Sequence, residues 1–335
     1  MPLEALRWPL TPVGLHYLLI HYDIPQVDPD QWSLSVGGLV ERPLTLTLAQ
    51  LRERAPQEVV ATMECAGNGR ARLEPRPLSQ PWLHEAVGTA RWRGAPLRAL
   101  LEEAGVGADA LEVVFTGLDR GVEAGVEQSF QRSLPLVEAL GDDALLAYEM
   151  NGAPLAPQHG FPLRLVVPGW YGMTNVKWLA SIEVVDQPFD GYQQARGYRL
   201  RQADDEDGVP LTRMRPRALM APPGIPDFFT RERTLALGPV TIEGRAWSGI
   251  APVVAVDVSV DGGETWAEAE LGDDGLGDWA WRPWRWEWRP EEPGRHVLCC
   301  RARDAAGYVQ PVEPEWNAGG YANNAVQRVV IVVTS

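Results

Sequence analysis

Residues 62–70 read TMECAGNGR, and this stretch decides how the rest of the chain is interpreted. Cys65 follows an apolar, β-branched run and precedes two glycines and the cation Arg70. A thiolate is the soft ligand that transition metals prefer, and glycines let the backbone turn tightly against a bulky group. The pattern indicates one ligand at the mouth of a cofactor site. A buried structural cysteine is the alternative, because free cysteine is among the most buried residue types.

The other two cysteines do not suggest a second site. Cys299 and Cys300 are neighbours in a run that reads as a strand, with one side chain on each face. Two adjacent cysteines and a third far away argue against a disulfide scaffold, and no Cys-x-x-Cys pair offers a zinc site or attached haem. We therefore expect both to be ordinary strand residues.

Length and charge limit the class of protein. A chain of 335 residues exceeds the size of most single cores, so we expect two domains. The formal net charge of -15 argues against sequence-independent nucleic-acid binding and suits a basic protein partner. No apolar run is long enough to span a bilayer, and the first residues show neither a secretion signal nor twin arginines. We expect no membrane association and a cytoplasmic location, or a periplasmic one if a leader has been removed.

The pattern of strands and helices changes once along the chain. Before about Val185, short apolar strands mix with helical stretches, of which residues 97–104, stopping at Gly105, are the clearest. A charge run at 202–208 and a proline-rich stretch at 213–226 then indicate a linker or an extended crossing segment. The strands expected in the first part are residues 59–62 and 111–115, and those expected in the last part are 253–260, 296–304 and 329–333.

The last part reads as an antiparallel sandwich of immunoglobulin type, without the immunoglobulin cysteines. Tryptophans at mostly alternate positions of 279–288 are expected to pack a sheet face. A carbohydrate or partner surface is the alternative for them.

Several ordered motifs resemble the sulfite oxidase family of molybdopterin enzymes, in a form without a fused haem domain. Agreement of many motifs in order is stronger than one short match. The blocks that carry the resemblance are 64–70, 147–152 leading into 159–164, 167–169 leading into 176–178, and, for the dimerisation domain, 247–249, 256–263 and 320–325.

The resemblance implies an α+β enzyme of two parts. A mixed α+β molybdopterin-binding domain is expected at 1–205, a linker or crossing segment at 206–226, and an immunoglobulin-like dimerisation domain at 227–335, through which two chains form a homodimer. Cys65 would be the one protein ligand to molybdenum, with the molybdopterin dithiolene and oxo groups in the remaining positions.

The resemblance also assigns residues to the cofactor. His159, Arg164 and Lys177 would bind its terminal phosphate, for which guanidinium and ammonium groups are suited. Asp119 would accept hydrogen bonds from the pterin, and His21 lies in the family's amino-terminal cofactor segment. The alternatives are solvated edge charges for Arg164 and Lys177, and a turn-capping role for Asp119.

On the substrate side, the resemblance implies roles for three further residues. Arg70 would place a positive charge near the metal ligand and attract a small anion such as sulfite. Tyr198 would donate a hydrogen bond next to an oxo group, and Trp82 would wall the pocket. A surface tyrosine and an ordinary core tryptophan are the alternatives for Tyr198 and Trp82.

The sequence departs from the family at two substrate arginines. Ile20 stands where the first is expected, and Ala251-Pro252 lie where the second is expected. Each charge-assisted hydrogen bond contributes about 1.5–3 kcal/mol, so two missing cations weaken attraction for a small dianion. Either the substrate is less charged or nearby arginines compensate, the candidates being Arg72, Arg76 and Arg196.

The function implied by the resemblance is oxygen-atom transfer at molybdenum, from sulfite to sulfate. Because no haem-binding segment accompanies the chain, electrons would pass to an external acceptor, either a redox protein such as a basic cytochrome c or oxygen. One alternative is an S-oxide or nitrate reductase with the same metal centre. The other is a non-enzymatic β-rich binding or adhesion protein in which Cys65 is structural.

Overall fold

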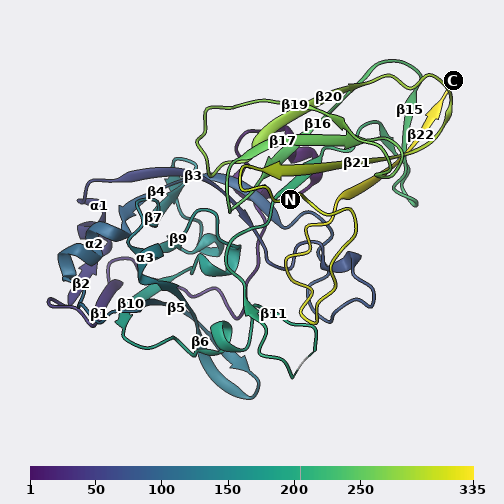
Figure 1. The fold of residues 1–335 in the computed structure, drawn as a ribbon. Helices are drawn as coiled ribbons and strands as arrows, with labels where there is room; N and C mark the ends of the chain where they lie inside the picture. The colour runs from purple at the N-terminus through teal and green to yellow at the C-terminus, as the bar shows by residue number, and fades with distance from the viewer. Residues whose placement is uncertain (204) are drawn as a thin grey trace. The chain divides into compact units, whose positions relative to one another are not determined.

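The computed structural model describes residues 1–203 and 205–335, and the chain forms two compact units built from separated segments (Figure 1). The mixed unit comprises Leu18–Ala66 and Ala90–Thr212. The sandwich unit comprises Met1–Tyr17, Gly67–Thr89 and Arg213–Ser335. Strands predominate and helices are few and short in the described residues. None of these helices is long and apolar enough to cross a membrane.

The first sheet of the mixed unit has the strand order β2-β1-β10-β5-β6. Strands β1 and β10 pair in parallel, and all other neighbouring strands of this sheet pair antiparallel. Its strands are β1 (Ser33–Gly38), β2 (Leu44–Thr47), β5 (Glu112–Glu123), β6 (Val126–Pro135) and β10 (Leu179–Val185). The long β5–β6 hairpin carries the buried polar residues Asp119 and Arg132.

A second sheet has the order β3-β4-β7-β8, with β9 also paired to β7. Its strands are β3 (Gln57–Glu64), β4 (Val87–Pro96), β7 (Leu145–Met150), β8 (Ala153–Pro154) and β9 (Arg164–Val166). A further pair of short strands in the mixed unit is β11 (Arg199–Leu200) and β12 (Val209–Pro210).

The helices follow local signals in the sequence. In α2 (Leu97–Ala104), the apolar side chains at three-and-four spacing are buried, and Gly105 ends the helix with a left-handed φ of +72°. Thr47 and Gln50 form a capping box at the start of α1 (Leu48–Arg52). The remaining helical segments are α3 (Leu136–Ala139), α4 (Tyr192–Ala195) and the 3-10 turns η1 (Leu3–Arg7), η2 (Val13–Leu15), η3 (Arg70–Arg72), η4 (Pro157–His159) and η5 (Gly172–Thr174).

The sandwich unit contains two sheets, with strand orders β13-β16-β20-β19 and β14-β15-β22-β21-β17-β18. The strands of the first are β13 (Arg217–Met220), β16 (Val240–Trp247), β19 (Glu270–Leu271) and β20 (Arg282–Trp288). Those of the second are β14 (Ile225–Pro226), β15 (Arg233–Ala236), β17 (Val253–Ser259), β18 (Ala267–Glu268), β21 (Gly294–Asp304) and β22 (Gln327–Thr334).

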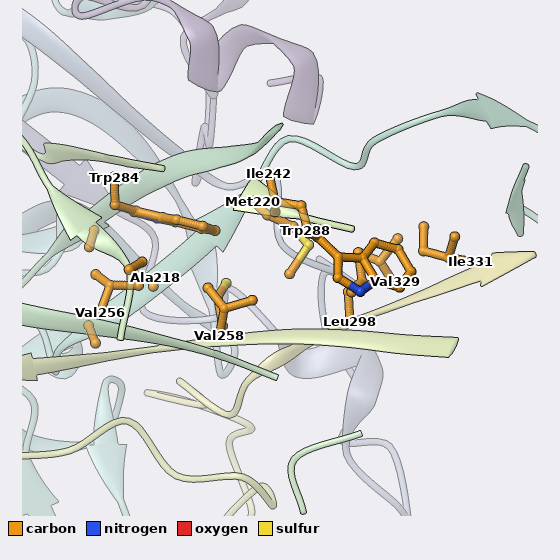
Figure 2. Close-up of a cluster of buried hydrophobic side chains, with 14 of the residues drawn as sticks. Ala218, Met220, Ile242, Val256, Val258, Trp284, Trp288, Leu298, Val329 and Ile331 are labelled. Atoms are coloured by element: carbon orange, nitrogen blue, oxygen red, sulfur yellow. The ribbon is translucent and has the colours of Figure 1, made fainter. Parts of the chain in front are cut away.

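Both sheets of the sandwich unit contribute to one apolar core. Figure 2 shows Ile242 and Trp284 of one sheet together with Val256 and Val258 of the other. Trp284 and Trp288 lie four residues apart on the same face of β20, and both are buried, as the tryptophan pattern predicted. This packing of two sheets face to face gives the unit its name.

Most of the predicted elements are present. The strands expected at 59–62, 111–115, 253–260, 296–304 and 329–333 correspond to β3, β5, β17, β21 and β22, and the helix at 97–104 is α2. Cys299 and Cys300 are buried strand residues, and burial raises the pKa of Cys299 to about 11. The side chain of Cys300 is part of the apolar core of the sandwich unit.

The segment predicted as a linker or crossing segment, 206–226, contains more structure than a linker would. Its residues 217–220 form the buried strand β13, which pairs with β16. Segments 67–89 and 1–17 also group with the C-terminal part of the chain. Asp204, in the predicted charge run, lies outside the described residues. The domain bounds 1–205 and 227–335 stay predictions.

Candidate active site

Cys65 lies directly after β3, at the end of a buried strand. The cysteine is reduced and exposes 5% of its surface, and Met63 and Glu64 before it are buried as well. β3 pairs with β4, and this pairing fixes the backbone that leads to the thiol. Within the described residues, no three His, Cys, Asp or Glu side chains gather in a metal-binding arrangement.

The two glycines after Cys65 make close approaches inside the sandwich unit. Gly69 has a left-handed φ of +92°, and a Cβ there would lie 2.6 Å from the carbonyl oxygen of Asn323. A Cβ on Gly67 would lie 2.5 Å from the guanidinium of Arg70. The left-handed φ and the nearby backbone oxygen favour glycine at position 69, whereas the nearest atoms at Gly67 belong to the flexible end of the Arg70 side chain.

Asp119 lies where β5 departs from regular pairing, since its register with β6 shifts between Thr116 and Arg120. Its carboxyl group is buried, and no group in the described residues donates a hydrogen bond to Oδ1. Burial raises the pKa of Asp119 to about 6, and the positive charge of Lys177 opposes the shift. Because a buried acceptor without a donor is costly, this position suits a ligand that brings N–H groups.

Lys177 is half-buried just before β10. Its Nζ donates to the carbonyl oxygens of Leu19 at 2.8 Å and Gln158 at 3.5 Å, and lies 4.3 Å from the centre of the Trp178 ring. Burial lowers the pKa of Lys177 to about 7, Arg164 lowers it too, and Asp119 opposes them. A bound anion would therefore restore the full charge of this ammonium group at neutral pH.

Arg164 and His159 are both buried near Lys177 in the mixed unit. The guanidinium of Arg164 donates to the carbonyl oxygens of His159 at 3.0 Å and Asn175 at 3.2 Å, and lies 4.7 Å from the Trp92 ring centre. Gly160 makes this packing feasible, because a Cβ there would lie 3.0 Å from Cβ of Lys177 and 3.1 Å from Cβ of Arg164. The structure thus brings the three predicted phosphate-binding residues together around one glycine.

His21 and Tyr198 form a pair. The Nε2 atom of His21 and the hydroxyl of Tyr198 share a short hydrogen bond, and Phe130 stacks on the imidazole with ring centres 4.3 Å apart. Tyr198 is buried and has a positive φ of 26°, which is uncommon for a residue with a side chain. Burial lowers the pKa of His21 to about 4, and the charges of Lys177 and Arg132 add to this effect. The histidine is therefore neutral at pH 7.

Two predicted substrate residues belong to the sandwich unit. Arg70 is buried, donates to the carbonyl oxygens of Gly319 and Gln80 at 3.0 Å each, and lies 5.0 Å from the Tyr321 ring centre. Trp82 is half-buried, and its Nε1 atom has no acceptor among the described residues.

Comparison with known proteins identifies the family. The sequence model of the oxidoreductase molybdopterin binding domain matches residues 21–193, and that of the Mo-co oxidoreductase dimerisation domain matches residues 229–334. Mitochondrial sulfite oxidase of Mus musculus is 38% identical, over 97% of this chain and 62% of the mouse protein. The chain belongs to the sulfite oxidase family.

The chain is also similar to a nitrate reductase and to a sulfane dehydrogenase. Nitrate reductase [NADH] 2 of Nicotiana tabacum is 33% identical, over 96% of this chain and 38% of the tobacco protein. The crystal structure of the sulfane dehydrogenase SoxCD from Paracoccus pantotrophus superposes with a TM-score of 0.85 and 28% identity, covering 100% of this chain and 86% of that one. The chain spans 62% of the length of the mouse relative.

The residues of the mixed unit fit the molybdenum–molybdopterin cofactor of the family. Cys65 offers a soft sulfur ligand, and the Oδ1 atom of Asp119 is a buried acceptor without a donor in the described part of the chain. Lys177 is a cation whose charge an anion would stabilise. A cofactor that carries both N–H donors and a phosphate would give Asp119 its missing donor and Lys177 an anionic partner.

Sequence reasoning missed Arg132. This residue exposes 1% of its surface, and its guanidinium carbon lies 5.7 Å from the centre of the Tyr198 ring. The available signal was its place between Phe130 and Leu134 on the alternating face of β6, where a charged residue is unexpected. By contrast, the three arginines proposed to compensate for the two missing cations are exposed, namely Arg72, Arg76 and Arg196.

Proposed function

We propose that the protein is a molybdenum-dependent oxidoreductase that oxidises sulfite to sulfate and passes the electrons to an external acceptor. The observation that carries the proposal is the similarity to sulfite oxidases over 97% of the chain. The buried thiol of Cys65 and the polar cluster of the mixed unit agree with it. The family match also favours an enzyme over a β-rich binding or adhesion protein.

When bound, the molybdenum–molybdopterin group supplies two-electron oxygen-atom transfer chemistry. Cys65 is proposed as its protein ligand. Asp119 accepts hydrogen bonds from the pterin, while His159, Arg164 and Lys177 hold the phosphate. Arg164 suits this role because two backbone carbonyls and the Trp92 ring already fix the plane of its guanidinium.

Tyr198 is proposed to donate a hydrogen bond to the oxygen that is transferred. Its partner His21 is neutral at pH 7, so Nε2 of the imidazole either accepts or donates the hydrogen bond to the phenol, according to the tautomer. Phe130 fixes the orientation of the imidazole by stacking. The pair therefore holds the phenol in one orientation without adding a charge.

Arg70 and Trp82 are proposed to serve the substrate, Arg70 as a fixed positive charge and Trp82 as a wall of the pocket. The two carbonyl contacts and the Tyr321 ring hold the Arg70 guanidinium in one place, so its charge needs no reorganisation when an anion binds.

Nitrate reduction is the second candidate function. The similarity to tobacco nitrate reductase favours it, and the replacement of two expected substrate arginines by Ile20 and Ala251-Pro252 is compatible with a substrate of lower charge. S-oxide reduction is a further alternative at the same metal centre.

The remaining parts of the proposal concern assembly and location. The dimerisation-domain match supports a homodimer formed through the sandwich unit, which we infer to be immunoglobulin-like, with domains at 1–205 and 227–335. A basic cytochrome c is the proposed acceptor because the chain has a net charge of -15, with oxygen as the alternative. The cytoplasmic location also stays a proposal.

Steady-state assays on fully molybdenum-loaded protein test the proposed function. Sulfite oxidation with cytochrome c or ferricyanide is expected, with nitrate and S-oxide reduction much slower. If loaded protein turns over nitrate or an S-oxide but not sulfite, the sulfite assignment is wrong and the reductase alternative replaces it.

A further inference from the structure

With Ile20 in place of the expected arginine, the Tyr198 end of the mixed unit needs another source of positive charge for an anion. Arg196 lies two residues before Tyr198, but its side chain is exposed. Arg132 is buried and adjacent to the tyrosine ring, with its guanidinium carbon 5.7 Å from the ring centre. Position and burial therefore single out Arg132.

Strand alternation brings Arg132 to this place. Phe130 and Arg132 are two residues apart on β6, so their side chains share one face of the sheet. Phe130 stacks on His21, and Arg132 lies over Tyr198. One face of β6 thus supports both members of the His21–Tyr198 pair.

A second contact fixes the guanidinium. Its Nη1 donates to the carbonyl oxygen of Gln193 in α4, five residues before Tyr198. This hydrogen bond ties β6 to the segment that carries the tyrosine. A planar guanidinium held at its edge by a carbonyl and at its face by a ring has little freedom to move away.

Arg132 also brings a permanent charge to this pair. His21 is neutral at pH 7, and Lys177 has a pKa of about 7, so its charge is partial there. An arginine stays protonated at every accessible pH. Arg132 thus supplies a buried positive charge at this end of the unit that does not vary with pH.

We propose that Arg132 is the positioning residue that attracts the anionic substrate toward Tyr198, in the role that the resemblance expects at the position of Ile20. The inference rests on the proposed function, because it assigns the recognition of an oxyanion such as sulfite to a residue. Arg132 acts through the orientation of Tyr198 and through the local positive potential.

Two substitutions separate charge from structure. Arg132→Met removes the charge, and we expect KM for sulfite to rise roughly ten- to hundredfold while kcat changes less than about threefold. Arg132→Lys keeps the charge, and its KM is expected to stay within about fivefold of wild type. The matched control is Arg120→Met, which removes an exposed cation of the same hairpin that pairs with Glu127 and is expected to change neither constant.

A readout without the cofactor completes the test. In metal-free protein, NMR titration of the His21 ring should show its pKa rising from about 4 in Arg132→Met, because one of the two like charges acting on it is gone, and Lys177 remains. Arg120→Met should leave this pKa unchanged.

The proposal is overturned if Arg132→Met keeps a wild-type KM at full molybdenum content. It is also overturned if Arg132→Lys is as damaging as Arg132→Met, since the residue is then only a structural brace. If wild-type holoenzyme turns over no oxyanion, the proposed function fails, and the His21 titration then decides separately: a raised pKa supports the action of Arg132 on the pair, and an unchanged one refutes it.

Discussion

At the scale of single residues, Asp119 shows how a cofactor site costs stability. Burial raises its pKa from 3.8 to about 6, so the ionised form is disfavoured in the folded protein. Between these two values the native state holds a proton that the unfolded state has lost, and stability therefore falls as pH rises. Above about pH 6 the full penalty applies. We infer that hydrogen bonds from the cofactor offset this penalty in the holoenzyme.

Asp119→Asn should therefore stabilise the metal-free protein and weaken cofactor retention. At pH 7 the free energy of unfolding is expected to increase by about 1–3 kcal/mol, from the size of the pKa shift, and the gain should disappear below about pH 4. Urea unfolding at both pH values measures it, and metal analysis should show reduced molybdenum after expression.

Asp142→Asn is the matched control, because this exposed carboxylate pairs only at the surface with Arg98. Its effect on stability should stay within about 0.5 kcal/mol. Equal stability of Asp119→Asn and wild type at pH 7 would show that burial does not penalise the ionised carboxyl group of Asp119.

At the scale of elements, the turn at Gly160 connects η4 to β9 and holds two cofactor residues. Its φ is +104°, a region that favours glycine. A Cβ at this position would press on Cβ atoms of Lys177 and Arg164, which are too close to the backbone to move freely. The glycine is therefore required both by the turn and by the positions of the two cations.

Gly160→Ala is expected to destabilise the protein by about 2–4 kcal/mol and to lower its molybdenum content. Gly152→Ala is the control, because Gly152 also has a positive φ, +80°, but has nothing within 4 Å of a Cβ. It should cost about 1–2 kcal/mol and leave the molybdenum content intact. Equal molybdenum loss in both variants would contradict the packing role of Gly160.

Local patterns in the sequence were sufficient for many elements. Alternation predicted β17, β21 and β22, and helical spacing with a terminal glycine predicted α2. β13 was not recognised, because prolines surround its short apolar run and only pairing with β16 makes it a strand. Tertiary contacts decide such segments.

The candidate site was predictable only in part, for a related reason. The family motifs indicated Cys65, Lys177 and their neighbours by type, but the hydrogen bond between His21 and Tyr198 joins residues 177 positions apart and has no local signal. Arg132 was missed because charged residues in strands are expected to face solvent. Its burial follows from the packing of β6 against the Tyr198 segment.

At the scale of the whole molecule, charge determines which acceptors approach quickly. A net charge of -15 produces a negative field that favours encounter with a basic protein and disfavours an anion. Salt screens such fields over about 8–10 Å near physiological ionic strength. Acceptor choice should therefore depend on ionic strength in opposite ways for acceptors of opposite charge.

We expect the second-order rate of cytochrome c reduction to fall about tenfold or more between 10 and 200 mM salt. The rate with ferricyanide, an anion, should stay constant or rise over the same range. Stopped-flow measurement of both reactions is the test. A cytochrome rate that does not depend on salt would argue against electrostatic recruitment of a basic acceptor.

The central claim is that the sulfur of Cys65 binds molybdenum, and X-ray absorption at the molybdenum edge tests it most directly. Wild-type protein from cofactor-competent cells should contain stoichiometric molybdenum, and Cys65→Ser should retain the fold, show one sulfur neighbour fewer at the metal and lose turnover, because a hydroxyl is a poor substitute for a soft thiolate. An unchanged sulfur count in Cys65→Ser, or wild-type protein that contains no molybdenum, would contradict the account.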